Sequence, residues 1–168
     1  MTTDQAIAAA DQSRRDGRQC DARGDLASHL AHLPADSLER ARTLCSLAQL
    51  DRDLHDITAS LQNYFEAVRI LRIYSEPLLL AYALRHLADV QRESAEADIR
   101  EAIAILSTHP DAKQLDLANA FRILALLTSD PATWRGARDL YSKLGIDAGI
   151  GECDRRLSQQ ERATPQQP

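Results

Sequence analysis

The sequence predicts an all-α protein, and the composition carries this prediction. Of the 168 residues, 44% are hydrophobic but only 4% are aromatic, and alanine and leucine supply much of the apolar content. Both residues favour helices, whereas strands are enriched in β-branched and aromatic side chains. Only six glycines and six prolines interrupt the chain, and runs of β-branched residues are absent. The length suffices for one domain with its own hydrophobic core.

Apolar residues recur three and four positions apart, which is the spacing of one face of a helix. The expected helices cover residues 3–15, 19–32, 37–51, 57–73, 77–92, 95–107, 114–128 and 133–144. Asp130 and Pro131 are typical of an N-cap and a first-turn proline, which would begin the last of these helices. Gly145, Gly149 and Gly151 then break the pattern.

The end of the chain is expected to form a cap and a tail. Residues 147–159 are predicted to be a final helix, whose polar outer face would cap the stacked helices. Residues 160–168 are polar and contain two prolines, which predicts a disordered tail. Residues 1–159 are therefore expected to form a single domain.

Three segments of the chain resemble one another, which indicates an internal repeat. They are ARTLCSLAQL from Ala41, AYALRHLADV from Ala81 and ANAFRILALL from Ala118. Each begins with alanine, carries a large apolar residue three positions later, and then has a Leu-Ala pair. One helical hairpin cannot bury its apolar faces alone, so about three or more must stack.

The order of large and small residues resembles the tetratricopeptide repeat, a helix–turn–helix unit of about 34 residues. In that family the fourth and seventh positions are large, the eighth and twentieth small, the twenty-fourth large or aromatic, and the twenty-seventh small. Counted from Ala41, the matching residues are, in order, Leu44, Leu47, Ala48, Ser60, Tyr64 and Ala67. The four repeats lie near residues 3–36, 41–74, 81–110 and 118–151; the first is degenerate and the third has a shortened turn.

This resemblance implies a right-handed α-solenoid, a superhelix of about four hairpins with a C-terminal capping helix. It also implies a concave groove, lined by the first helix of each repeat. The implied groove residues are Arg42, Gln49, Arg52, Tyr82, Arg85, Asp89, Arg92, Asn119 and Arg122. Equivalent positions hold Cys45, Leu126 and Ser129, and in the degenerate first repeat Asp4, Ile7, Asp11 and Arg14.

The resemblance further implies a non-catalytic module that binds a peptide or protein segment. Among the groove positions of the last three repeats, arginines outnumber acids, so a segment bearing carboxylates is the expected ligand. Arg85 and Arg122, with Asn119, would hold its carboxylates. Two alternatives stay open: the arginines pair only with neighbouring carboxylates, or the chain is a homo-oligomeric scaffold, such as a homodimer, without a peptide ligand. Gln49 and Asp89 stand where chaperone-binding relatives carry asparagine, which argues against that specificity.

No catalytic or cofactor-binding pattern stands out in the sequence. His29 and His32 have helical spacing but no third ligand nearby, so no metal site is expected. His86 is expected to be a packed structural residue, since no nucleophile or glycine-rich loop accompanies it. Cys45 is expected to be a small buried hydrophobe rather than a reactive thiol. The protein is therefore predicted to be no enzyme and to need no cofactor.

Charge and cysteine usage argue against other classes of protein. The net charge is −5, and the arginines near the N-terminus alternate with aspartates, which predicts salt-bridged helices rather than a nucleic-acid surface. No apolar run approaches the roughly 20 residues of a membrane span, and the N-terminus lacks the pattern of a signal peptide. Three cysteines without paired spacing predict reduced thiols in the cytoplasm.

Overall fold

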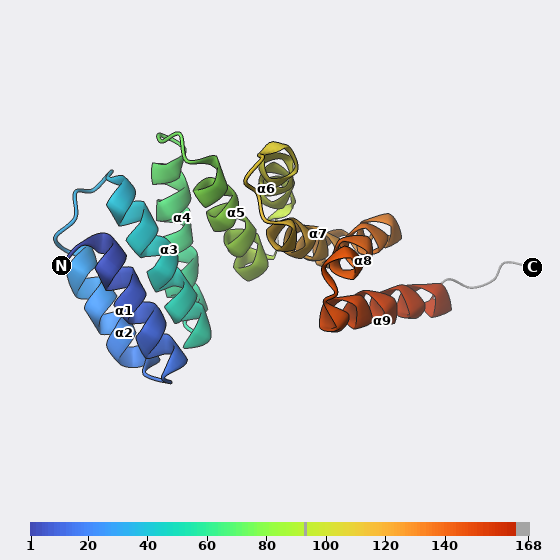
Figure 1. Cartoon of the computed structure of the whole chain (residues 1–168), viewed down its shortest axis with the longest axis horizontal. Helices are drawn as coiled ribbons and strands as arrows, with labels where there is room; N and C mark the ends of the chain where they lie inside the picture. The colour runs from blue at the N-terminus through green and yellow to red at the C-terminus, as the bar shows by residue number, and fades with distance from the viewer. Residues whose placement is uncertain (93, 164–168) are drawn as a thin grey trace, which may run out of the picture. The chain divides into compact units, whose positions relative to one another are not determined.

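The computed structural model describes residues 1–92 and 94–163, and these residues form nine helices and no strand. The helices are α1 (Thr3–Arg15), α2 (Gln19–Leu30), α3 (Leu38–Asp53), α4 (Ile57–Leu71), α5 (Pro77–Gln91), α6 (Glu96–Thr108), α7 (Gln114–Thr128), α8 (Pro131–Leu144) and α9 (Asp147–Ala163) (Figure 1). The predicted all-α fold class is confirmed. None of the described helices is long and apolar enough to cross a bilayer.

The chain divides into two compact units, Met1–Gln91 and Arg92–Pro168. Helices α1 to α5 belong to the first unit and α6 to α9 to the second. That residues 1–159 act as a single domain stays a prediction.

The first eight helices begin and end within two residues of the expected positions. Helix α8 begins at Pro131, because the Asp130 carboxylate accepts from the backbone N–H of Ala132 at 3.2 Å and of Thr133 at 2.9 Å. The predicted start of the tail at residue 160 is wrong, since α9 continues to Ala163. Residues 164–168, the rest of that tail, lie outside the described residues.

In the first unit, α1 packs with α2, α3 with α4, and α5 against α4. Helix α3 also contacts α1 and α5, so the first helices of successive hairpins lie side by side. In the α3–α4 hairpin, the Ser60 hydroxyl donates to the Ala48 carbonyl at 2.9 Å, and Ala48, Ser60 and Tyr64 are fully buried. This contact confirms the close helix approach that the small residues at those repeat positions predict.

A buried carboxylate joins α2, α3 and α4. Asp51 is fully buried and accepts from the Asn63 amide at 2.7 Å and from Arg23 Nε at 2.5 Å. Arg23 also donates to Asp56, the N-cap residue of α4, at 2.9 Å. The sequence predicts that the N-terminal arginines pair with the aspartates between them; Arg18 does so with Asp16 at 3.1 Å, whereas Arg23 pairs with acids of the next hairpin.

In the second unit, α7 and α8 form a hairpin, with α6 against α7 and α9 against α8. Trp134, Tyr141 and Cys153 are buried between α7, α8 and α9. Helix α9 lies close to the Tyr141 ring because residue 149 is glycine: a Cβ there would lie 2.6 Å from Tyr141 Cγ. This packing holds α9 in place as the closing helix of the unit.

Candidate functional site

The first unit presents a half-buried group of polar side chains on α1, α3 and α5. Residues on α3 and α5 recur three and four positions apart, so helical periodicity brings them to one face of each helix. We call this group the α1–α3–α5 cluster; its members are Arg14, Gln49, Arg52, Asp53, Tyr82, Arg85, His86 and Asp89. Five of the predicted groove residues, from Gln49 to Asp89, therefore meet in this cluster.

Ion pairs connect the three helices across this face. Arg52 Nη1 lies 3.3 Å from Asp89 Oδ2, which joins α3 to α5. Arg14 pairs with Asp53, which joins α1 to α3. Arg42 Nη2 lies 2.5 Å from Asp4 Oδ1 and makes a second link between α1 and α3. Three cations of this face are thus already partnered, in keeping with one of the alternatives that the sequence leaves open.

His86 is the unusual member of the cluster, because both of its ring nitrogens face guanidinium groups. Arg85 Nη2 lies 3.1 Å from Nε2, and Arg52 Nη1 lies 3.4 Å from Nδ1. His86 as a whole is only 8% exposed, and burial, followed by the charges of nearby arginines, lowers the pKa of its imidazole to about 2. The imidazole is therefore neutral at physiological pH.

A neutral imidazole has one N–H donor and one acceptor nitrogen. Guanidinium groups only donate. One of the two contacts at His86 therefore sets a donor against a donor, whichever tautomer the ring adopts. Two donors therefore face one acceptor nitrogen of the ring, and Asp89 Oδ2, 3.3 Å from Arg52 Nη1, supplies a further acceptor. A ligand carboxylate could take the place of Asp89 and accept from both guanidinium groups.

Two tyrosines hold the His86 ring in position. The ring stacks on Tyr64 at a centroid distance of 5.8 Å and tilts against Tyr82 at 4.3 Å. The Tyr82 hydroxyl donates to Gln49 Oε1 at 2.9 Å, which ties α5 to α3. Burial raises the pKa of Tyr82 to about 12, so the hydroxyl stays protonated and remains a donor. These contacts link α3 and α5 around the ring.

There is open space beside the cluster. A shallow hollow of about 400 Å³ is lined by Asp11, Arg14 and Arg15 of α1. Arg14 belongs to both the hollow and the cluster. Asp11 and Arg14 are positions that the repeat pattern assigns to the groove, so the hollow extends the cluster along that predicted surface.

The remaining predicted residues have partners of their own or lie apart from the cluster. Arg122 Nε donates to Glu152 Oε2 at 2.7 Å, and Asn119 Oδ1 accepts from the Tyr141 hydroxyl at 2.7 Å, both within the second unit. Arg92 is exposed and has a φ of 55°, directly after α5. Arg85 belongs to the first unit and Arg122 to the second, so their joint action on one ligand stays a prediction.

The cysteine and histidines considered for chemistry have structural surroundings. Cys45 is buried, and burial raises the pKa of its thiol to about 12, so it stays protonated and out of reach of a substrate. His29 Nε2 lies 3.1 Å from the Thr3 hydroxyl, and His32 Nδ1 lies 2.8 Å from the Ser28 carbonyl. Within residues 1–92 and 94–163, no three side chains are grouped as metal ligands.

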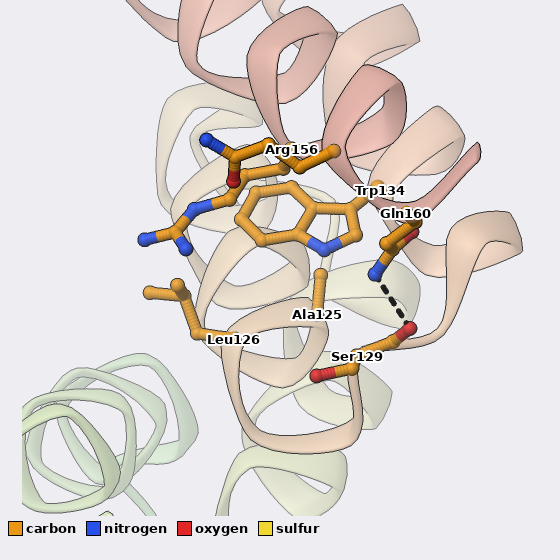
Figure 2. A pocket seen from close by; sticks show the side chains of 7 residues that line it. Ala125, Leu126, Ser129, Trp134, Arg156 and Gln160 are labelled. Carbon is orange, nitrogen blue, oxygen red and sulfur yellow. Dashed lines mark hydrogen bonds between the residues drawn. The ribbon is translucent and has the colours of Figure 1, made fainter. Parts of the chain in front are cut away.

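A second candidate site lies in the second unit, between the C-terminal end of α7, the start of α8, and α9. The pocket has a volume of about 220 Å³ and is lined by Ala125, Leu126, Ser129, Trp134, Arg156, Gln159 and Gln160 (Figure 2). Leu126 and Ser129 are predicted groove positions. The other lining residues were not predicted from the sequence, because their approach depends on how α8 and α9 fold back on α7.

Solved structures resemble this chain over almost its whole length. A putative kinesin light chain from Podosopora anserina with nearly identical TPR-like repeats superposes with a TM-score of 0.70, at 15% identity, over 95% of this chain and 88% of its own. The fold is a TPR-like helical repeat. BtubC from P. vanneervenii gives a TM-score of 0.65 at 18% identity, over 99% of this chain and 67% of its own. No family model and no curated protein matches the chain.

Proposed function

We propose that this TPR-like protein is a non-catalytic interaction module that binds a carboxylate-bearing segment of another polypeptide. The first helices of its hairpins provide the binding surface, with the α1–α3–α5 cluster at the centre. TPR-like repeats typically serve as protein-interaction scaffolds, because stacked hairpins present a long, rigid surface. The three cysteines are free thiols, which is usual for proteins of a reducing compartment. We therefore propose that the protein acts in the cytoplasm.

The observation that carries the proposal is the excess of donors at His86. Arg52 and Arg85 both point N–H groups at a ring that can accept from only one of them. A ligand carboxylate has two oxygens and can accept from both guanidinium groups at once. Because the cluster is half-buried, such bonds are stronger than the same contacts in open water.

The other proposed contacts are arranged around this centre. Arg42, Gln49, Tyr82 and Asp89 lie on the same helices as the two central arginines. Arg92, Asn119 and Arg122, which belong to the second unit, are proposed to contact a further part of the same polypeptide.

A peptide-binding assay tests the proposal. The probes are a fluorescein-labelled pool of hexapeptides rich in aspartate and glutamate, and a matched pool with asparagine and glutamine in their place. The acidic pool is expected to bind more tightly than the amide pool, and binding should weaken at high salt. The double variant Arg52→Gln with Arg85→Gln should lose about tenfold or more of its affinity for the acidic pool.

The matched control removes the same charge elsewhere. Arg18→Gln with Arg69→Gln replaces two exposed arginines that pair with Asp16 and Asp36, and it should leave binding unchanged. Circular dichroism confirms that each variant is folded. Equal losses in the two double variants would show that only net charge matters and would refute the site. A second result would also refute the proposed binding site. Light scattering would then show a dimer for the wild type and for the control, and a monomer only for Arg52→Gln with Arg85→Gln.

The variant Asp89→Asn separates ligand binding from simple ion pairing. In the free protein, Asp89 competes for Arg52 at 3.3 Å. Removing that charge should strengthen binding of the acidic pool, because Arg52 no longer has to break its ion pair with Asp89 before it pairs with a ligand carboxylate. If the arginines serve only in surface ion pairs, the variant should bind no acidic peptide and lose at most about 1 kcal/mol of stability.

A further inference from the structure

The pocket between α7, α8 and α9 has the size of a single side chain. Its volume is about 220 Å³, whereas sites for small molecules and cofactors commonly measure about 300–1,000 Å³. A cofactor is too large for this pocket, but one side chain of the size of leucine or phenylalanine would fit. The pocket is therefore suited to one residue of a polypeptide.

The walls of the pocket divide into an apolar and a polar part. Leu126 is the partly exposed apolar wall, backed by the buried Ala125 and Trp134, and Arg156 and Gln160 stand on either side of the indole (Figure 2). The Trp134 ring is held by the core of the unit and is only 2% exposed. A ligand that fits must offer an apolar group and, within a few bonds of it, a group that accepts hydrogen bonds.

The pocket is already formed before any ligand binds. Ser129 ends α7 in the left-handed conformation, with a φ of 55°. Its carbonyl accepts from Gln160 Nε2 at 2.7 Å, drawn as the dashed line in Figure 2. This bond ties α9 to the end of α7 and fixes the distance between the two sides of the pocket. A ligand would therefore bind without the entropic cost of closing the site.

Arg156 supplies the charge that the ligand should complement. Within the part of the chain that the structure describes, no hydrogen bond or ion pair is found for its guanidinium group. Nearby arginines are paired: Arg122 with Glu152 at 2.7 Å, and Arg138 with Asp154 at 2.5 Å. A cation that stands beside an apolar wall without a carboxylate can bind one from a ligand through two parallel bonds.

We propose that this pocket binds the C-terminal residue of a partner polypeptide. The apolar side chain of that residue packs against Leu126 at the edge of the buried Trp134 indole, and its α-carboxylate pairs with Arg156. A C-terminal residue carries one apolar group and one carboxylate on the same Cα, which matches the single cation beside the single apolar wall. The inference rests on the proposed function in that the ligand is a polypeptide, but it uses residues outside the α1–α3–α5 cluster.

The only tryptophan of the chain lies on the pocket wall, so the full-length protein contains its own probe. The experiment titrates it with N-acetyl-Gly-Ser-Leu as the free acid, and separately as the C-terminal amide, while Trp134 fluorescence is recorded. The free acid is expected to give a saturable change in emission and to bind about tenfold or more tightly than the amide. N-acetyl-Gly-Ser-Gly should bind more weakly than the leucine peptide, since it leaves the apolar wall uncovered.

Two variants assign the carboxylate to its partner. Arg156→Gln should remove the preference for the free acid and leave binding of the amide unchanged. Arg155→Gln removes the same charge from the preceding position, which does not line the pocket, and should behave as the wild type. Equal binding of acid and amide, or equal effects of the two variants, would overturn the proposal.

Two further measurements distinguish binding in this pocket from binding at the cluster and from occupancy by the chain's own end. Arg52→Gln with Arg85→Gln should leave the Trp134 titration unchanged, so the cluster and the pocket can fail independently. If a chain that stops after Ala163 bound the free acid while the full chain did not, the occupant would be the chain's own C-terminal segment. That result would overturn the proposal of a partner. An emission that no peptide changes would overturn it as well.

Discussion

Replacing Gly149 by alanine tests how α9 is held against α8. The new Cβ would lie 2.6 Å from Tyr141 Cγ and 2.7 Å from both Cδ atoms, whereas carbon atoms in contact are about 3.5–4.0 Å apart. The ring is buried, and its hydroxyl donates to Asn119 at 2.7 Å. Either the ring must therefore move, which strains its hydrogen bond to Asn119, or α9 must move away from α8.

The expected loss of stability follows from three contributions. Overpacking costs about 1–3 kcal/mol, and loss of the Tyr141 hydrogen bond costs about 0.5–1.5 kcal/mol. Alanine in a helix returns roughly 0.5–1 kcal/mol relative to glycine. Where the ring moves, the free energy of unfolding should therefore fall by about 0.5–4 kcal/mol, and the Tm by at least about 2 °C for a unit of this size.

Gly151 on the same helix provides the matched control. A Cβ there would meet only the flexible end of Arg155, with Nη1 at 3.5 Å. Gly151→Ala should therefore stabilise the helix by about 0.5–1 kcal/mol. Thermal unfolding followed by Trp134 fluorescence reports on the second unit, and circular dichroism reports on the whole chain. If the two variants shift the Tm in the same direction, the close contact between α9 and the Tyr141 ring is not the reason that position 149 needs glycine.

Three other predictions concern the first unit. In the unfolded chain the His86 imidazole takes up a proton below about pH 6.5, whereas in the folded chain it stays neutral down to about pH 2. The free energy of unfolding should therefore fall as the pH falls below about 6.5, by up to about 1.4 kcal/mol per pH unit. His86→Gln should remove this slope in urea unfolding at pH 7, 6 and 5, and identical slopes would contradict the buried neutral ring. Asp51→Asn should lower the unfolding free energy by about 1–3 kcal/mol, with Asp25→Asn, exposed in the middle of α2, as the control that leaves it unchanged. Ser60→Ala should cost about 1 kcal/mol in the same assay through loss of the bond to the Ala48 carbonyl; no change would mean that the contact is not stabilising.

Local and periodic features of the chain could be predicted from the sequence. The spacing of apolar residues located the first eight described helices, because burial of one helical face imposes that spacing. Ala48, Ser60 and Tyr64 could be assigned to the interior of a hairpin, since the close approach of two helices requires small residues at fixed positions. Asp130 and Pro131 marked the start of α8, because capping depends on neighbouring residues only.

Features that depend on long-range contacts could not be predicted in this way. The composition of residues 160–163 indicates disorder, yet Gln160 bonds to the Ser129 carbonyl 31 residues earlier in the chain, and the helix continues. The pocket around Trp134 likewise needs α9 to return to the end of α7. A pattern of apolar residues gives the face that a helix buries, but not the helix against which that face packs.

The net charge of the predicted groove likewise could not be derived from its arginines alone. Counting residues by repeat position suggested an excess of positive charge, because the count left out the first repeat and the residues beside the groove positions. Asp4 and Asp53, on α1 and α3, neutralise Arg42 and Arg14, so the charge of the face is close to balanced. What distinguishes the cluster is its hydrogen-bond inventory: the ring can accept from only one of Arg52 and Arg85, and Asp89 Oδ2, 3.3 Å from Arg52 Nη1, is the acceptor that a ligand carboxylate would replace. The affinity of this surface for a carboxylate should therefore depend on the geometry around one neutral ring rather than on the number of arginines along the groove.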